Sequence, residues 1–579
     1  MAAVAPVRAL RSPAGALAAP WLPLAACLAA STLVVRDALS ATTPVTLVLY
    51  LASTAYYLYR LGRPWRLRAA FQRIDVVLAG GVALLYLAGA AWFATRPGHF
   101  HFDEFITAYT SATLPAFGSI QWFAGYPDPG QWICQFPILF FALQWPFVGL
   151  LEPSVAAIRV SVWPYLALTA VYLYALAGRY TGSRAARVAA VVLFAALAPN
   201  LYLASMGVHF ASAALFLLAC VYHYERAAAE RRADHAALCG LWLGLSFLTY
   251  TASFLALPLL VAYALIGQPV HRGPPAGAIV RPLTGFAAVL LPFAAYALGQ
   301  NNYFVQRPDQ VGGPFKDAAT TGDLAERASN LWALVRDAAL ANVRTIYTPG
   351  DGGVTNYDFG HQALLDHATL ALLALGGAVA LSRAARSRDD APLRPLAAVL
   401  LGFVCGMVLT LPTGAFHRLV VVFPFVALLL AMGLEGLSAL VGRLDARAAA
   451  ASLAVGTTLL VAANLVALDR MIRVDGPKAS ESIASYLMAH VRPGAHVTIA
   501  ADPVFHLQRE LYFRTGNRYR FTTGWFWDVS PTLDDGPVIV YAPEIGQVAE
   551  IERRFPDWAV VDTIDGQPLV KYVVVLPPA

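Results

Sequence analysis

Long apolar runs recur along most of this sequence, and they restrict what the chain can fold into more than any other feature. The chain has 579 residues, of which 58% are hydrophobic and only 13% are charged. In a soluble globular protein about a quarter of the residues are charged. The mean hydropathy is +0.58. Runs of this length and composition are typical of helices that cross a membrane. The sequence therefore predicts a polytopic α-helical membrane protein.

The apolar runs divide into about thirteen candidate spans of membrane-crossing length. They occupy residues 17–35, 41–59, 74–94, 158–178, 188–204, 208–224, 236–249, 252–267, 282–299, 362–381, 394–411, 419–440 and 449–468. The first run lacks a convincing cleavage site and is followed closely by another, so we expect it to be a retained span. The five cysteines lie in or beside apolar runs without metal-ligand spacing, which indicates buried thiols rather than disulfides.

Basic connections between the spans predict their direction, because loops rich in Lys and Arg stay in the cytoplasm. These connections are Arg60–Arg73, Arg179–Arg187, Glu225–His235, His271–Arg281, Arg383–Arg394 and Arg443–Arg447. All of them face one side only if Ile133–Leu151, interrupted by Pro137 and Pro146, is re-entrant or interfacial. We therefore expect a cytoplasmic N-terminus and an outer C-terminal tail. The net charge of +6 then orients the protein and does not indicate nucleic-acid binding.

The tail changes character after Asp469, where the sequence becomes mixed and polar. Short β-rich runs begin at His496, Pro537 and Lys571, and helical stretches lie near Ser480–His490 and Gln547–Phe555. Strands that alternate with helices predict a small α/β domain. The expected organisation has three parts. They are N-terminal extra spans with a basic loop (1–73), a membrane domain with outer loops 95–135 and 300–361 (74–470), and an outer α/β domain (471–579).

An acidic pair, Asp103-Glu104, follows the third span and falls in the first long outer loop. Two adjacent carboxylates near a membrane are costly to keep there, so a functional role is favoured. The loop also contains aromatic residues, whose faces suit sugar recognition. The structural alternative is an aromatic belt at the interface, with Asp103 capping a short helix.

A second candidate site lies in an outer connection at His417-Arg418, just before a span. A guanidinium group presents hydrogen-bond donors in an arrangement that fits phosphate oxygens. The structural alternative is an arginine whose side chain reaches a lipid headgroup.

Three segments in order resemble the GT-C glycosyltransferases of the protein O-mannosyltransferase and lipid A aminoarabinose transferase type. The acidic pair comes first, Gln135-Phe-Pro-Ile-Leu-Phe-Phe-Ala-Leu follows about thirty residues later, and Arg418-Leu-Val-Val-Val-Phe-Pro-Phe comes near the end of the membrane region. The turn at Gly244–Tyr250 also resembles a family segment. The resemblance covers most of residues 74–440.

This resemblance implies transfer of a sugar from a polyprenyl-phosphate donor to a lipid, glycan or protein acceptor on the outer face of a cell membrane. Asp103 would be the general base, Glu104 would orient the acceptor or the loop, and Arg418 with His417 would hold the donor phosphate. Further substrate contacts are expected at His101, Tyr109, Gln135, His209, Tyr250, Tyr357, Asp358 and His361.

The chain departs from the family pattern in two places. Relatives often carry a further acidic residue near 205–211, where this chain has Met-Gly-Val-His-Phe, and Thr249-Tyr250 lacks the usual lysine. These departures leave the acceptor and a divalent-metal requirement open, and no motif fixes a cofactor. The turn-rich segment 347–358 could act as a lid, although turn chemistry alone explains its composition.

Two other functions fit a polytopic membrane protein. A transporter or flippase of a lipid-linked substrate usually places charges inside its spans and shows repeated halves. In this chain the acidic pair lies in a loop and no repeat is evident. A catalytically inert scaffold that binds partners through its tail is the other alternative, and a lack of both sugar transfer and polyprenyl-phosphate binding would favour it.

Overall fold

The computed structural model of the protein describes most of the chain after Gln72. The described residues are 72–94, 102–113, 139–151, 153–230, 233–250, 255–266, 313–348, 363–387, 390–409, 416–474, 479–500, 507–524, 538–542, 559–565 and 571–576, with parts of 282–290 and residue 553. The predicted spans 17–35 and 41–59, most of 282–299, and the predicted helical stretch 547–555 lie outside them.

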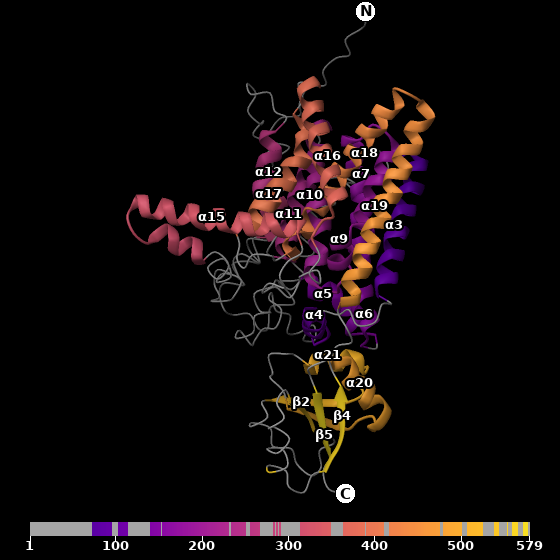
Figure 1. The fold of residues 1–579 in the computed structure, drawn as a ribbon, viewed down its shortest axis with the longest axis vertical. Helices are drawn as coiled ribbons and strands as arrows, with labels where there is room; N and C mark the ends of the chain where they lie inside the picture. The colour runs from indigo at the N-terminus through magenta and orange to yellow at the C-terminus, as the bar shows by residue number, and fades with distance from the viewer. Residues whose placement is uncertain are drawn as a thin grey trace, which may run out of the picture.

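The described membrane region is a bundle of helices with a smaller α/β part at one end (Figure 1). Its helices are α3 (Arg73–Ala94), α4 (Phe102–Ala112), α5 (Leu139–Val148), α6 (Val155–Val160), α7 (Trp163–Tyr180), α8 (Arg184–Ala196), α9 (Ala198–Ala204), η4 (His209–Ser212), α10 (Ala213–Glu230), α11 (Ala233–Phe247), α12 (Ala256–Leu265), α15 (Leu324–Tyr347), α16 (His367–Ser387), η6 (Ala391–Leu393), α17 (Arg394–Phe403), the π-helical η7 (Val404–Val408), η8 (Phe416–Val421), α18 (Phe423–Gly442) and α19 (Ala446–Val474).

Six helical segments among the described residues are long and apolar enough to cross a membrane, or seven if α8 and α9 form one span bent by 63°. These segments, with their composition, are those of a multi-pass membrane protein. Predicted spans 236–249 and 252–267 are the shorter helices α11 and α12, of 15 and 10 residues. Helix α5 has 10 residues and contains Pro146. Its rise is about 15 Å, half of the hydrocarbon thickness. The re-entrant or interfacial placement of Ile133–Leu151 stays a prediction.

Close contacts between helices depend on small residues, as is usual in membranes. Helices α16 and α18 cross at Gly376 and Gly433. A Cβ atom at Gly376 would lie 2.0 Å from the Leu429 carbonyl oxygen, and one at Gly433 would lie 2.7 Å from the Leu372 carbonyl oxygen. Glycine at both positions therefore allows the two backbones to touch.

Three carboxylates stabilise the end of the bundle that lies away from α4, which we call the basic end. Asp75 accepts a hydrogen bond from Arg184 (3.1 Å), Glu225 from Arg394 (2.8 Å) and Glu435 from Arg383 (2.7 Å). These pairs join α3 to α8, α10 to α17, and α18 to α16. They also bring the predicted basic connections 179–187, 225–235 and 383–394 to one end of the bundle.

The C-terminal part contains α20 (Ala479–His490), α21 (Leu507–Arg514) and five strands: β1 (His496–Ala500), β2 (Arg520–Gly524), β3 (Val538–Ala542), β4 (Ala559–Asp565) and β5 (Lys571–Leu576). The strand order is β2-β1-β3-β5-β4. Strand β1 pairs in parallel with β2 and β3, whereas β5 pairs antiparallel with β3 and β4. The three β-rich runs predicted from the sequence are β1, β3 and β5. Strands β2 and β4 are not among the predicted β-rich runs.

A small apolar core joins the helices of this part to β1. It contains Ile483, Ala484 and Leu487 of α20, Val497 and Ile499 of β1, Leu507 and Leu511 of α21, and Tyr519. The Tyr519 hydroxyl donates to the carbonyl oxygens of Leu487 and Val491, 2.7 and 3.0 Å away. The C-terminal part therefore has its own core, separate from that of the membrane helices.

Candidate functional site

The acidic pair lies in the first turn of α4, at the end of the bundle that faces the C-terminal part (Figure 1). Carboxylates are stabilised there because the N-terminal end of a helix carries partial positive charge. The side chain of Asp103 is partly exposed, whereas that of Glu104 is buried. The two neighbours therefore occupy different environments.

Glu104 forms a bidentate ion pair with Arg159 in the protein interior. Arg159 donates from Nη2 to Oε1 (3.0 Å) and from Nε to Oε2 (3.1 Å). Both side chains are only 1% exposed. The Arg159 guanidinium also lies 4.8 Å from the ring centroid of Phe93. A buried pair with this geometry fixes the first turn of α4 relative to α6.

The peptide of Gly207, between α9 and η4, connects this ion pair to Gln144 of α5. The Gly207 amide donates to Glu104 Oε2 (3.2 Å), and its carbonyl accepts from Gln144 Nε2 (2.9 Å). Ser111, in the last turn of α4, donates to Gln144 Oε1 (2.6 Å). We call Glu104, Ser111, Gln144, Arg159 and Gly207 the polar hub. The hub holds both ends of α4.

Only glycine fits at position 207. A Cβ atom there would lie 2.2 Å from Cγ2 of Ile158 and 2.6 Å from its carbonyl oxygen. Real Cβ atoms do not approach other heavy atoms so closely. The glycine therefore permits the close approach of the α9–η4 connection to α6, which in turn places the Gly207 amide on Glu104.

Predicted residues His209, Tyr250 and His417 meet around Phe210, although they are far apart in the sequence. The ring centroids of His209 and Tyr250 are 5.1 Å apart, and those of Phe210 and His417 are 5.7 Å apart. Phe210 also contacts Tyr250 edge-on, at 6.3 Å. We call these four residues the aromatic cluster. Tyr250 follows the turn at the end of α11. The predicted turn segment Gly244–Tyr250 thus begins in the last turn of this helix.

The side chain of His209 is buried, with only 4% of its surface exposed. Phe141 stacks on it, with ring centroids 6.3 Å apart.

Arg418 lies next to His417 on η8, which packs against η4 and η7. Its side chain is partly exposed. A Cβ atom at Gly406 of η7 would lie 3.7 Å from Arg418 Cβ. Asn342 of α15 donates to the carbonyl oxygen of Met407 (3.0 Å), so α15 supports η7 from the other side. Contacts thus continue from α4 through Gly207 and η4 to η8. From the sequence resemblance we also predict that Asp103 and Arg418 line one outward-facing cavity.

The remaining predicted substrate contacts divide into two groups. Tyr109 lies on α4 against Tyr512 of α21, with ring centroids 5.3 Å apart. The others lie outside the described residues: His101, Gln135, Tyr357, Asp358 and His361. Within the part of the chain that the structure describes, no group of three or more His, Cys, Asp or Glu side chains is arranged to hold a metal ion.

The sequence interpretation missed two members of the polar hub that have a recognisable signal. Arg159 is a single charge near the start of the apolar segment Val155–Tyr180, and Gln144 is a single amide inside α5. A lone polar side chain inside an apolar run usually has a buried partner, and Glu104 and Ser111 are those partners here. Gly207 carries no such signal, because its role depends on contacts with distant residues.

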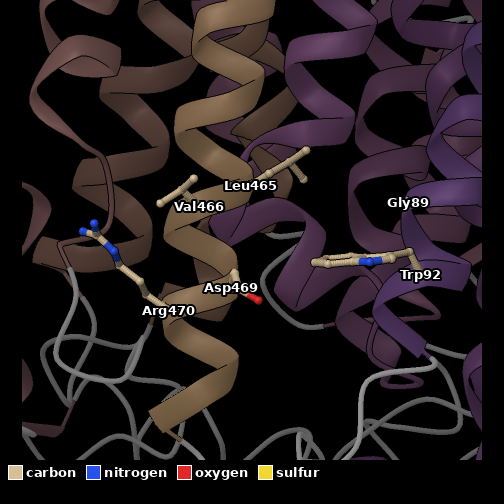
Figure 2. A pocket seen from close by; sticks show the side chains of 6 residues that line it. All are labelled: Gly89, Trp92, Leu465, Val466, Asp469 and Arg470. Carbon is tan, nitrogen blue, oxygen red and sulfur yellow. The ribbon is translucent and has the colours of Figure 1, made fainter.

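A cavity of about 700 Å³ opens between α3 and α19 (Figure 2). Its lining residues are Gly89, Trp92, Leu465, Val466, Asp469 and Arg470. Trp92 and Asp469 approach it from facing helices, while Arg470 points to the other side of α19 (Figure 2). Among the predicted site residues that the structure describes, none lines this cavity.

Comparisons with known proteins identify the fold. Residues 135–296 match the family model described as dolichyl-phosphate-mannose-protein mannosyltransferase. The structure of ArnT from Cupriavidus metallidurans in the apo state gives a TM-score of 0.53 at 14% identity, covering 86% of this chain and 97% of that chain. The same enzyme bound to undecaprenyl phosphate gives 0.52 at 16% identity, with the same coverage. The chain has the GT-C fold. No curated protein sequence matches it significantly.

The family-model match covers several residues of the polar hub and of the aromatic cluster. The family-model match over 135–296 includes Gln144, Arg159 and Gly207 of the polar hub and His209, Phe210 and Tyr250 of the aromatic cluster. Asp103 and Arg418 lie outside this match, but within the GT-C resemblance that the sequence itself shows.

Proposed function

We propose that this protein is a membrane glycosyltransferase that transfers a sugar from a polyprenyl-phosphate donor to a hydroxyl acceptor on the outer face of the membrane. Asp103 is the general base. Arg418, with His417, binds the donor phosphate. The acceptor is a lipid, glycan or protein. In this proposal the C-terminal α/β domain and the site lie on the outer side, and the basic end of the bundle faces the cytoplasm.

The observation that carries the proposal is the different environment of the two carboxylates, on a GT-C fold. Glu104 is buried, paired with Arg159 and bonded to Gly207. A carboxylate held in this way is suited to positioning. Asp103 lies one residue earlier on the same helical turn and is partly exposed, so the fixed neighbour holds its backbone in a defined place. This arrangement suits a group that must meet a substrate at a set distance.

The reaction then follows from the chemistry of these groups. The acceptor oxygen attacks the anomeric carbon while Asp103 takes its proton. The bond from that carbon to the phosphate oxygen breaks, and polyprenyl phosphate leaves with the bonding electrons. Arg418 stabilises the phosphate charge that develops. Displacement of this kind inverts the anomeric carbon. In this proposal His209 and Tyr250 contact the donor beside the phosphate.

Sugar transfer in membranes tests this proposal. Labelled polyprenyl-phosphate sugars are supplied to membranes that contain the wild type, Asp103→Asn or Arg418→Ala. Asp103→Asn should lose at least about a hundredfold in rate because it removes the general base, with donor binding retained. Arg418→Ala should weaken donor binding. Asp337→Asn, on the exposed face of α15, is the matched control and should transfer sugar like the wild type. Full transfer by Asp103→Asn would disprove the assigned base. Movement of the labelled lipid across the membrane without transfer would favour a transporter.

A further inference from the structure

Helix α21 of the C-terminal part packs directly on α4, the helix that carries Asp103. Phe513 lies with its ring centroid 6.3 Å from that of Phe105, and Tyr512 meets Tyr109 edge-on at 5.3 Å. The Arg509 guanidinium lies 5.6 Å from the Tyr109 ring centroid. Figure 1 shows α21 at the top of the C-terminal part, next to α4 and α6.

The contact is a shared apolar core. Phe105 is fully buried, and Phe513 is only 2% exposed. Three further residues from the membrane region complete this core: Ala108, Val148 and Ile158. Burial of aromatic rings stabilises this contact through the hydrophobic effect and through ring packing.

Different faces of α4 and α21 contact different partners. On α21, Leu507 and Leu511 face the core of the C-terminal domain, while Tyr512 and Phe513 face α4. On α4, Glu104 and Ser111 belong to the polar hub, and Phe105 with Tyr109 faces α21. Helix α4 has only 11 residues and would be marginal alone. Its position is therefore set from two sides, by the hub and by α21.

Arg514, the last residue of α21, extends the contact toward the acidic pair. Its guanidinium lies 5.4 Å from the Phe105 ring centroid, and its side chain is 8% exposed. Burial lowers the pKa of Arg514, and the carboxylates of Glu510, Glu481 and Glu104 oppose that change. The cation of Arg514 is thus close enough to Glu104 to interact with it electrostatically.

We propose that the C-terminal domain completes the catalytic site, with Tyr512, Phe513 and Arg514 as positioning residues that hold the Asp103 turn of α4. This inference rests on the proposed function. The hub fixes Glu104 from the membrane side, and α21 packs on Phe105, the next residue of the same turn. Releasing one face lets the turn shift, and a displacement of about 1 Å in a catalytic group lowers rates by up to about a hundredfold.

The test uses the full-length protein and measures kcat, the donor KM and amide exchange in α4. Phe513→Ala should lower kcat about tenfold or more, with the donor KM within about twofold, because Arg418 and the aromatic cluster are untouched. Exchange of residues 102–112 should quicken in the same variant. Phe513→Leu should restore most of the rate. Met488→Ala is the control, since Met488 is an exposed apolar residue on α20, away from α4.

A double-mutant cycle shows whether the two helices act through one contact. Phe105→Ala and Phe513→Ala remove opposite halves of the same packing. The double variant should therefore be about as slow as the slower single variant, rather than slow by the product of both effects. If Phe513→Ala is not recovered folded, Tyr512→Ala replaces it, with Tyr109→Ala as its partner, because Tyr109 and Tyr512 are only partly buried.

The outcomes separate this inference from the proposed function. Wild-type protein that transfers no sugar would remove the proposed function, while amide exchange still tests how α4 is held. Folded Phe513→Ala protein with wild-type kcat, or with unchanged exchange in α4, would overturn the positioning role even where the wild type is active. Multiplicative effects in the cycle would also contradict it.

Discussion

At the residue scale, the pair formed by Glu104 and Arg159 shows how a charge can be kept inside a membrane protein. Each ion alone would be strongly disfavoured in that interior, and their two hydrogen bonds offset the cost only while both are present. The pair therefore contributes specificity of position more than net stability. Asp103, one residue away, is partly exposed, so adjacent residues of the same chemistry have different surroundings.

Removing one member of this pair should destabilise the protein more than removing both. Glu104→Ala leaves the Arg159 guanidinium buried without its carboxylate, at a cost of about 3–5 kcal/mol. The double variant Glu104→Met/Arg159→Met replaces both ions with apolar side chains and should unfold at a higher temperature than Glu104→Ala. Thermal unfolding of the purified proteins in detergent measures both. A double variant less stable than Glu104→Ala would show that the pair itself is strongly stabilising.

Gly207 offers a second residue-scale prediction. Gly207→Ala should lower the unfolding temperature and reduce transfer, because the added Cβ collides with Ile158 and displaces the amide that binds Glu104. Gly81→Ala is the matched control. Nothing lies within 4 Å of its Cβ position inside α3, so alanine should be neutral or stabilise that helix by up to about 1 kcal/mol. Equal behaviour of the two variants would contradict the role given to Gly207.

Charges near apolar runs are unusual, and on that ground the sequence predicts the acidic pair and His417-Arg418 as site residues. Their roles stay predictions. The burial of Glu104 was not predictable, since it depends on Arg159 and on Gly207, which is about a hundred residues further along. The meeting of His209 with Tyr250 and of Phe210 with His417 likewise depends on how distant helices pack. Contacts of this kind cannot be predicted from the local sequence.

At the element scale, α15 supports the segment that carries Arg418. It extends sideways from the bundle (Figure 1), and several of its apolar side chains, such as Trp332 and Leu340, are exposed. Near its C-terminal end, the buried Asn342 side chain bonds to the Met407 carbonyl of η7. A π-helical turn leaves backbone carbonyls out of the regular pattern, and this amide satisfies one of them.

Removing that amide should affect donor binding. Asn342→Ala leaves the Met407 carbonyl without its donor, a loss of about 1–3 kcal/mol for a buried group. The η7 turn beside Arg418 should relax, so the affinity for polyprenyl phosphate should fall severalfold while Asp103 keeps its place. Equilibrium binding of a labelled polyprenyl phosphate gives the comparison. Asn330→Ala, on the same helix, should bind normally, and equal affinities in both variants would exclude the link.

Helices with a long apolar pattern were predicted well. Bends and strands that depend on packing against distant residues were not. The apolar stretch that became α3 matches its prediction within one residue at its start. The bend between α8 and α9 follows from Pro199, yet the sequence alone was interpreted as one continuous span. Strands β2 and β4 contain the segments Arg520-Phe-Thr-Thr-Gly and Ala559-Val-Val-Asp-Thr, which have few long apolar side chains. They form strands by pairing with β1 and β5.

At the scale of the whole molecule, the arginine-rich connections between helices gather at one end of the bundle. The basic end gathers arginines from several connections around Asp75, Glu225 and Glu435. The other end carries α4, η4, η8 and the C-terminal domain. Because arginine-rich connections stay in the cytoplasm, this division predicts the orientation of the protein in the membrane.

Labelling of single cysteines in intact cells tests that orientation. Leu444 is 90% exposed in the connection between α18 and α19, and Met488 is 48% exposed on α20. A membrane-impermeant maleimide should label Met488→Cys in intact cells and Leu444→Cys only after the cells are opened. The wild type, whose Cys220 and Cys239 are buried, gives the background. The reverse pattern would invert the assignment of inside and outside.

The contact between α4 and α21 also has a consequence for the order in which the protein is made. Helix α4 leaves the ribosome early, yet its partner begins at Leu507, almost four hundred residues later. At about 5–20 residues per second, α4 waits roughly 20–80 s for that partner. The Asp103 turn therefore gains its α21 neighbours only late in synthesis. If α21 holds this turn as proposed, a chain that stops short of α21 would be inserted in the membrane without the proposed site, and activity would begin only after α21 is made.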